Sequence, residues 1–130
     1  MKEYQKLIES SELAINKGFF ATTVPKRQYG AAVLTKSGNI YTAGQYSSYN
    51  HVTSIHAEMG AILMATMNGE KEIEALALSS NNNEHVCCCG VCLQFMKEHV
   101  ARTGIDIKLI YNEKAGIRQV SLSDITKELW

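Results

Sequence analysis

In the first third of the chain, the spacing of the hydrophobic residues changes from helical to strand-like. Apolar positions three to four residues apart predict an amphipathic helix over about residues 3–16, ended by Gly18. These positions are Tyr4, Leu7, Ile8, Ala14 and Ile15. Farther along, the apolar runs 30–35 and 40–44 flank Ser37-Gly38-Asn39 and predict a β-hairpin.

The middle of the chain predicts a helix and a strand between irregular segments. Residues 19–29 and 45–54 lack clear periodicity and are interpreted as a connector and a loop. A helix is expected over residues 55–67, closed by Asn68-Gly69, and a short apolar strand over 73–78. The expected buried stripe of this helix is Ile55, Met59, Ile62, Leu63 and Met67.

The last part of the chain predicts two helices and two strands. A helix is expected over residues 90–103, followed by strands over 105–111 and 117–122. Ser123 is expected to cap a final short helix over 124–129. Helices alternating with about five strands predict a layered α/β fold, and no repeat or linker divides the chain. We therefore interpret residues 1–130 as a single domain.

Composition and charge narrow the class of protein. Hydrophobic residues make up 45% of the chain and charged residues 20%, as in an ordinary globular domain. Thirteen basic residues balance thirteen acidic ones, so no net positive charge favours nucleic acid. No apolar run approaches the ~20 residues of a membrane span, and the N-terminal residues are too polar for a signal peptide. We expect a soluble cytoplasmic protein that binds neither membrane nor nucleic acid.

Two short clusters carry the candidate chemistry: His56-Ala57-Glu58 and Cys87-Cys88-Cys89-Gly90-Val91-Cys92. Four crowded cysteines join no distant loops, so in a reducing compartment they indicate metal or redox chemistry. If both clusters begin helices at one edge of a sheet, His56, Cys89 and Cys92 supply three zinc ligands. The open position would hold a water whose pKa falls to about 7. Glu58 would stand beside it as a proton shuttle.

Each cluster also has a plainer interpretation. A Cys-x-x-Cys alone is a redox motif or half of a structural zinc site, and Cys87, Cys88 or His85 could close its fourth position. Otherwise Cys87 and Cys88 are interpreted as packing residues, and the histidines at 51, 85 and 99 as surface or loop residues. The position of Glu58, two residues after His56, favours the catalytic interpretation.

The combined pattern resembles the zinc deaminases, whose signature is H-x-E…P-C-x-x-C. Residues 30–44 look like the first hairpin of cytidine deaminases, and Cys89-Gly90-Val91-Cys92-Leu93-Gln94-Phe95-Met96 looks like their second zinc helix. The closing hairpin with residues 120–124 resembles the end of cytidine deaminases and of blasticidin S deaminase. The resemblance implies a three-layer α/β/α fold, a five-stranded mixed sheet and Zn²⁺ as cofactor.

The resemblance also implies residue roles. His56, Cys89 and Cys92 would bind zinc, and Glu58 would protonate the ring nitrogen and collect the proton of the water. Backbone N–H groups near Ala57 and Cys89 would orient the ring and the water. The products would be a uracil-like base and ammonia. Proteins resembling this one are commonly dimers or tetramers, so a homo-oligomer is expected.

Several positions depart from the family pattern. Cys88 stands in place of the proline before Cys-x-x-Cys, and Leu93 in place of an arginine after it. Gln45-Tyr46-Ser47 aligns with an Asn-x-Glu pair that resembles a ribose site, and Arg27 aligns with an aromatic residue. The substrate end of the pocket is therefore predicted to be changed, with Arg27 facing a carboxylate, a phosphate or only solvent.

The sequence thus predicts a zinc-dependent hydrolytic deaminase of a cytosine-type nucleoside or nucleoside analogue. Cytidine, deoxycytidine and blasticidin S are the candidate substrates, with Gln45, Ser47, Ala57 and Arg27 as binding residues. One alternative is a deaminase of a free base, a nucleotide, a purine or a modified pyrimidine. The other is a non-catalytic structural-zinc or redox protein.

Overall fold

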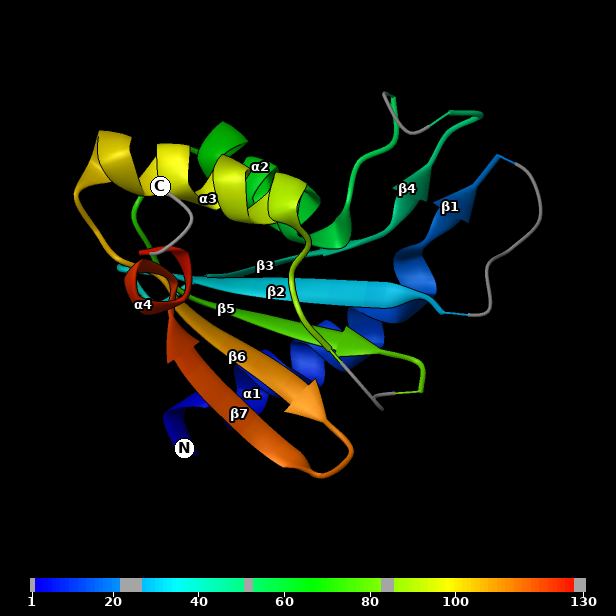
Figure 1. Ribbon diagram of the computed structural model, residues 1–130, viewed down its shortest axis with the longest axis horizontal. Helices are drawn as coiled ribbons and strands as arrows, with labels where there is room; N and C mark the ends of the chain where they lie inside the picture. Colours follow the sequence, from blue (N-terminus) through cyan, green and yellow to red (C-terminus); the bar gives the residue numbers. More distant parts are fainter. Residues whose placement is uncertain (1, 22–26, 51–52, 83–85, 128–130) are drawn as a thin grey trace.

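The computed structural model describes residues 2–21, 27–50, 53–82 and 86–127, the side chains of residues 2 and 3 excepted. Figure 1 shows a twisted sheet with helices on both faces. The elements are α1 (Lys2–Ala14), η1 (Ile15–Lys17), β1 (Phe19–Phe20), β2 (Tyr29–Thr35), β3 (Ile40–Gly44), β4 (Tyr46–Ser47), α2 (Ala57–Met67), β5 (Ile73–Ser80), α3 (Gly90–Thr103), β6 (Lys108–Glu113), β7 (Gly116–Ser121) and α4 (Leu122–Thr126).

The main sheet has five strands in the order β3-β2-β5-β6-β7. Strands β5 and β6 are parallel and are joined through α3, whereas the other neighbouring pairs are antiparallel. Residues of β2, β5 and β6 are buried on both faces of the sheet, which explains their nearly continuous apolar sequences. One hydrophobic cluster lies under α2 and α3 and the other under α1. The predicted three-layer fold with a mixed sheet is confirmed.

Close packing of the N-terminal helical segment on the sheet requires glycine in β2. A Cβ atom added at Gly30 would lie 2.3 Å from the carbonyl oxygen of Ser11 and 2.5 Å from the backbone nitrogen of Ile15. Any side chain there would force the helical segment away from the sheet. Gly30 therefore sets how closely this layer approaches β2.

Helix α2 differs from its prediction in its start and in its buried face. It begins at Ala57 rather than residue 55, and His56 is its N-cap. Ile62 is buried as expected, but Leu63 and Met67 are 36% and 76% exposed, so that part of the predicted stripe is wrong. Small residues form much of the buried face, which lets the helix lie close to β2 and β3 and turns its larger side chains outward. The buried residues are Ala57, Glu58, Ala61, Ile62 and Ala65.

The remaining differences concern short elements and element ends. Strands β1 and β4 fall in segments interpreted as connector and loop, and they pair in parallel with the rings of Phe19 and Tyr46 5.6 Å apart. Strand β5 runs two residues past its predicted end, and β6 begins three residues late, at Lys108. Ser121 rather than Ser123 caps the last helix, because the Ser123 hydroxyl donates to Asp106 instead. Part of the connector and the end of the last predicted helix lie outside the described residues.

Among the described residues, no helix combines the length and the apolar character needed to cross a bilayer. The longest, α3, has 14 residues and is amphipathic.

Candidate zinc site

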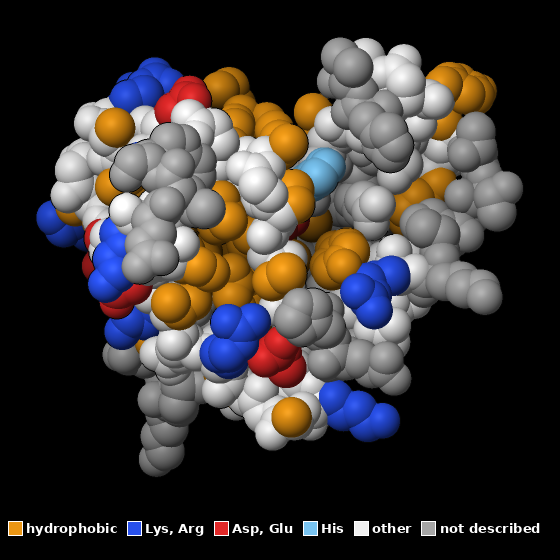
Figure 2. Space-filling view, in the orientation of Figure 1, with side chains coloured by type: hydrophobic (Ala, Val, Ile, Leu, Met, Phe, Trp, Pro, Cys, Tyr) orange, Lys and Arg blue, Asp and Glu red, His pale blue; other side chains and the backbone are white. Residues whose placement is uncertain are grey.

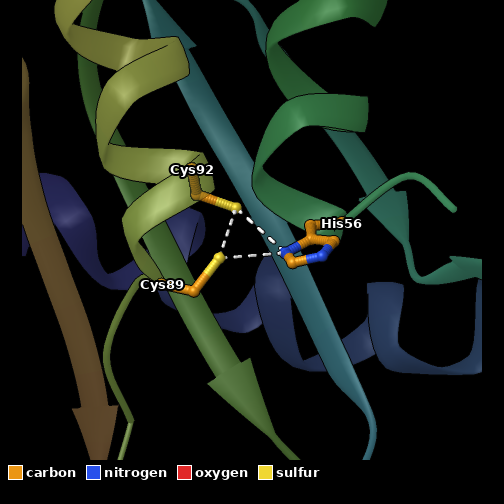
Figure 3. Close-up of side chains that lie close together, drawn as sticks. All are labelled: His56, Cys89 and Cys92. Carbon is orange, nitrogen blue, oxygen red and sulfur yellow. Dashed lines mark hydrogen bonds between the residues drawn. The ribbon is translucent and has the colours of Figure 1, made fainter. Parts of the chain in front are cut away.

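The N-terminal ends of α2 and α3 lie side by side over one end of the sheet (Figure 1). His56 is the N-cap of α2 and Cys89 is the N-cap of α3, while Glu58 and Cys92 lie in the first turns of these helices. Neither N-cap side chain binds a backbone N–H of its own helix. The imidazole and the thiol are therefore directed toward each other instead of being used as caps (Figure 3).

The three predicted ligands converge on one point. The Nδ1 atom of His56 lies 3.2 Å from the Sγ atoms of both Cys89 and Cys92, and the two sulfurs are 3.6 Å apart. Tetrahedral zinc with ordinary bond lengths would separate nitrogen from sulfur by about 3.6 Å and the two sulfurs by about 3.8 Å. The three ligand atoms are therefore slightly closer together than they would be around a bound zinc ion, and small side-chain shifts would admit the ion. One imidazole and two thiols are also the donor types that zinc prefers.

The electrostatics of Cys92 support a cation at this point. The thiol is buried, and this burial, followed by the negative charge of Glu58, raises the pKa of Cys92. A thiolate at this position therefore needs a positive charge beside it. A divalent cation held by the three ligands supplies that charge.

A fourth protein ligand is not brought to this point by the part of the chain that the structure describes. Among those residues, the metal-competent group contains His56, Cys89 and Cys92 alone. Cys88 is buried, as expected, whereas Cys87 is exposed, so its predicted role in packing is wrong. His99 donates to the carbonyl of Lys71 and is remote from the thiols. His51 and His85 lie outside the described residues.

A pocket of about 150 Å³ opens beside the cluster and is lined by two of its three ligands, His56 and Cys89. His56, Ala57, Glu58 and Cys89 line one part of it, and Glu58 is only 5% exposed. Figure 2 shows a hollow between the surface formed by α2 and α3 and the β1–β4 unit. The arrangement can hold a small molecule beside a metal centre and a carboxylate.

The remaining lining residues are one predicted binding residue and two that were not predicted. Gln45 lines the pocket, and its Oε1 is buried without a hydrogen-bond partner among the described residues. Tyr29 and Cys87 also line it. Ser47 and Arg27 are not among the lining residues, and Arg27 is exposed. Tyr29 directly precedes the first hairpin glycine, which was the available signal for it.

Known proteins share this sequence pattern and fold. Residues 1–105 match the family described as "Cytidine and deoxycytidylate deaminase zinc-binding region". A cytidine deaminase from Halalkalibacterium halodurans is 26% identical over 99 residues, which are 75% of this chain and 73% of that protein.

Solved structures of similar fold include two bacterial cytidine deaminases. The enzyme from Burkholderia pseudomallei has a TM-score of 0.77 at 22% identity and covers 94% of each chain. The enzyme from Bacillus anthracis has a TM-score of 0.70 at 22% identity, covering 100% of this chain and 90% of the other. At these identities the structural likeness establishes the fold.

Proposed function

The chain belongs to the cytidine and deoxycytidylate deaminase family, and from this premise we propose that it deaminates a cytosine-type nucleoside or nucleoside analogue. The reaction is zinc-dependent hydrolysis of a C–N bond. The observation that carries the proposal is that the ligand atoms of His56, Cys89 and Cys92 lie within 4.8 Å of one another, and that His56 and Cys89 line a pocket together with Glu58.

The roles of the residues follow from their chemistry. Zinc, when bound, lowers the pKa of a water molecule so that hydroxide is available near neutral pH. Glu58 takes the proton of the attacking water and delivers it to the ring nitrogen. The carboxylate then takes the proton of the hydroxyl group newly bonded to the ring carbon and passes it to the leaving amino group, so that this hydroxyl becomes the carbonyl of the product. One C–O bond forms, one C–N bond breaks, and ammonia leaves. The low exposure of Glu58 keeps bulk water away from these transfers.

Recognition of the rest of the substrate is assigned to the other end of the pocket. Gln45 would accept a hydrogen bond from the substrate, because its buried Oε1 has no partner among the described residues. Its Nε2 donates to Ser47 Oγ at 3.4 Å, so Ser47 would orient the amide. The backbone N–H of Ala57, at the start of α2, would orient the ring. Arg27 is exposed and does not line the pocket, so it would meet a carboxylate or phosphate of a substrate that extends beyond the pocket.

We also assign the protein to the cytoplasm as a homo-oligomer, either a dimer or a tetramer. The four described cysteines are free thiols, which suits a reducing compartment. The outward face of α2 and the start of α3 carry exposed apolar side chains suited to a subunit interface. They are Leu63, Met64, Met67 and Val91.

Zinc analysis and a substrate panel test the proposal together. We expect one zinc per chain, bound by three protein ligands, and ammonia release from at least one of cytidine, deoxycytidine and blasticidin S. Zinc bound by four protein ligands would contradict the enzymatic role. The panel also includes cytosine, CMP and purines, because Ser47 and Arg27 favour a changed substrate. Ammonia release from cytosine, CMP or a purine alone would instead establish the alternative substrate class of free bases, nucleotides or purines.

A further inference from the structure

The loop that leads to Cys89 is held by side chains of the β6–β7 hairpin. Val86 is fully buried, and both of its backbone polar groups are bound by side chains of that hairpin. Its N–H donates to Glu113 Oε2 at 3.2 Å, and its carbonyl accepts from Arg118 Nη2 at 3.1 Å. Buried backbone groups need partners, and here side chains provide what a neighbouring strand would otherwise provide.

Glu113 and Arg118 act on this loop as one unit. Arg118 Nε donates to Glu113 Oε1 at 3.0 Å. Each of these side chains therefore bonds to the other through one atom and to the Val86 backbone through a second atom. The planar guanidinium has the fixed fork of donors that this double contact requires. The pair therefore fixes both the position and the direction of the Val86 peptide groups.

Tyr111 binds the backbone of Cys88, the residue directly before the predicted zinc ligand Cys89. Its hydroxyl accepts the backbone N–H of Cys88 at 3.4 Å. Tyr111 and Arg118 are paired across the β6–β7 ladder, and the guanidinium lies 4.5 Å from the ring centroid of Tyr111. The hairpin thus contacts the loop backbone at two of the three residues that precede Cys89.

We propose that Tyr111, Glu113 and Arg118 are positioning residues that hold Cys89 in place as a zinc ligand. The inference rests on the proposed function. Cys89 lies just before α3, which begins at Gly90, whereas Cys92 is inside that helix. A shift of the loop therefore moves the first thiol relative to His56 and leaves the second in place. Residues that orient metal ligands typically contribute ten- to a hundredfold to metal affinity.

A purely structural role predicts a different pattern. The Arg118 side chain is 43% exposed and that of Glu113 is 16% exposed. An ion pair this open to solvent contributes little to folding on its own. Removing either partner also leaves a buried backbone group of Val86 unpaired, so some loss of thermal stability is expected in any case. The positioning role predicts, in addition, a loss of zinc affinity that a destabilised control variant does not show.

The experiment measures zinc affinity in the full-length protein by competition with the chromogenic chelator 4-(2-pyridylazo)resorcinol. We expect Arg118→Gln and Glu113→Gln each to weaken zinc binding by about ten- to a hundredfold, with circular dichroism confirming the fold. Arg118→Lys keeps the charge and loses the fork, so we expect an intermediate loss. It also serves as the test if Arg118→Gln does not fold. The matched control is Asp106→Ala, because Asp106 accepts the backbone N–H groups of Ile107 and Ser123 at the opposite end of β6.

The outcomes separate this inference from the proposed function. Zinc affinities within twofold of wild type in both glutamine variants would overturn the positioning role. An equal loss in Asp106→Ala would also overturn it, since the effect would then reflect general destabilisation. If wild type binds no zinc, the proposed function itself fails. If wild type binds zinc and releases ammonia while the variants keep their affinity, only the positioning role fails.

Discussion

The two ends of α2 use a glutamate in opposite ways. Glu58, in the first turn, is 5% exposed and lies in the pocket beside the three ligands. Glu70, three residues past the last turn, is at the surface and ties the β2–β3 hairpin to the segment that connects α2 with β5. Its carboxylate accepts from four donors, namely Ser37, Tyr41, Thr35 and Asn39.

The difference shows what prepares a carboxylate for chemistry. Hydrogen bonds from Ser37, then Tyr41, Thr35 and Asn39, lower the pKa of Glu70 to about 2. Near neutral pH that group remains an anion, so it cannot exchange a proton with a substrate. Glu58 instead contacts the thiol of Cys88, which is a weak donor. Full hydrogen bonding at the surface suits a structural contact, and a buried carboxylate that lines the pocket suits proton transfer to a bound molecule.

Replacing each of the two glutamates by glutamine tests this contrast. It is expected to give the largest change in activity. We expect Glu58→Gln to lower kcat by about a hundred- to ten-thousandfold, because the general acid–base group is lost. Zinc should remain bound, since Glu58 is not a ligand. Glu70→Gln should leave kcat within about twofold. Steady-state ammonia release and zinc content measure both, and similar losses in the two variants would abolish the contrast.

The sequence predicts most of the fold because long apolar runs and turn glycines determine it. The bounds of β3 and α3 agree with the structure. The two-residue strands β1 and β4 were missed because so short a pair leaves no periodicity. The α2 stripe was partly wrong because periodicity alone does not reveal that alanines form much of the buried face.

The metal cluster could be predicted because His56, Cys89 and Cys92 stand at helix starts, which local sequence reveals. The positioning contacts could not, because Tyr111 and Arg118 lie far along the chain from the loop they hold, and only strand register brings them to it. The pocket role of Tyr29 was missed although its place directly before Gly30 was an available signal. The roles of Gln45, Ser47, Ala57 and Arg27 toward substrate stay predictions.

The contact between Cys88 and Glu58 gives a second test of the contrast between the two glutamates, with a smaller expected loss of activity than in Glu58→Gln. Burial, followed by the charge of Glu58, raises the pKa of the Cys88 thiol well above its usual range. The thiol therefore stays protonated and can donate to the carboxylate. Removing it in Cys88→Ala should lower kcat about two- to tenfold, the range of one hydrogen bond. Cys88→Ser restores a donor and should recover most of the rate. Equal rates in the alanine and serine variants would show that this donor does not orient Glu58.

The smallest effect, a change in thermal stability, is expected when the Glu70 carboxylate is protonated in acid. A carboxyl whose folded pKa is about 2, against 4.5 ordinarily, stabilises the fold above pH 4.5 and loses that contribution as the pH falls toward 2. Glu70→Ala should therefore lower the Tm near neutral pH. The decrease should be only a few degrees, because the contact is exposed to solvent. The gap from wild type should narrow below pH 4.5.

Thermal unfolding followed by circular dichroism from pH 7 to pH 2.5 measures this gap. Both proteins lose zinc in acid as the thiolates protonate, so the difference between them isolates Glu70. Tyr41→Phe removes one of the four donors and should give a smaller gap with the same pH dependence. A gap that stays constant over the whole range would mean that the ionised carboxylate contributes nothing. In that case packing alone would hold the hairpin to β5, and the contrast between the two ends of α2 would rest on Glu58 alone.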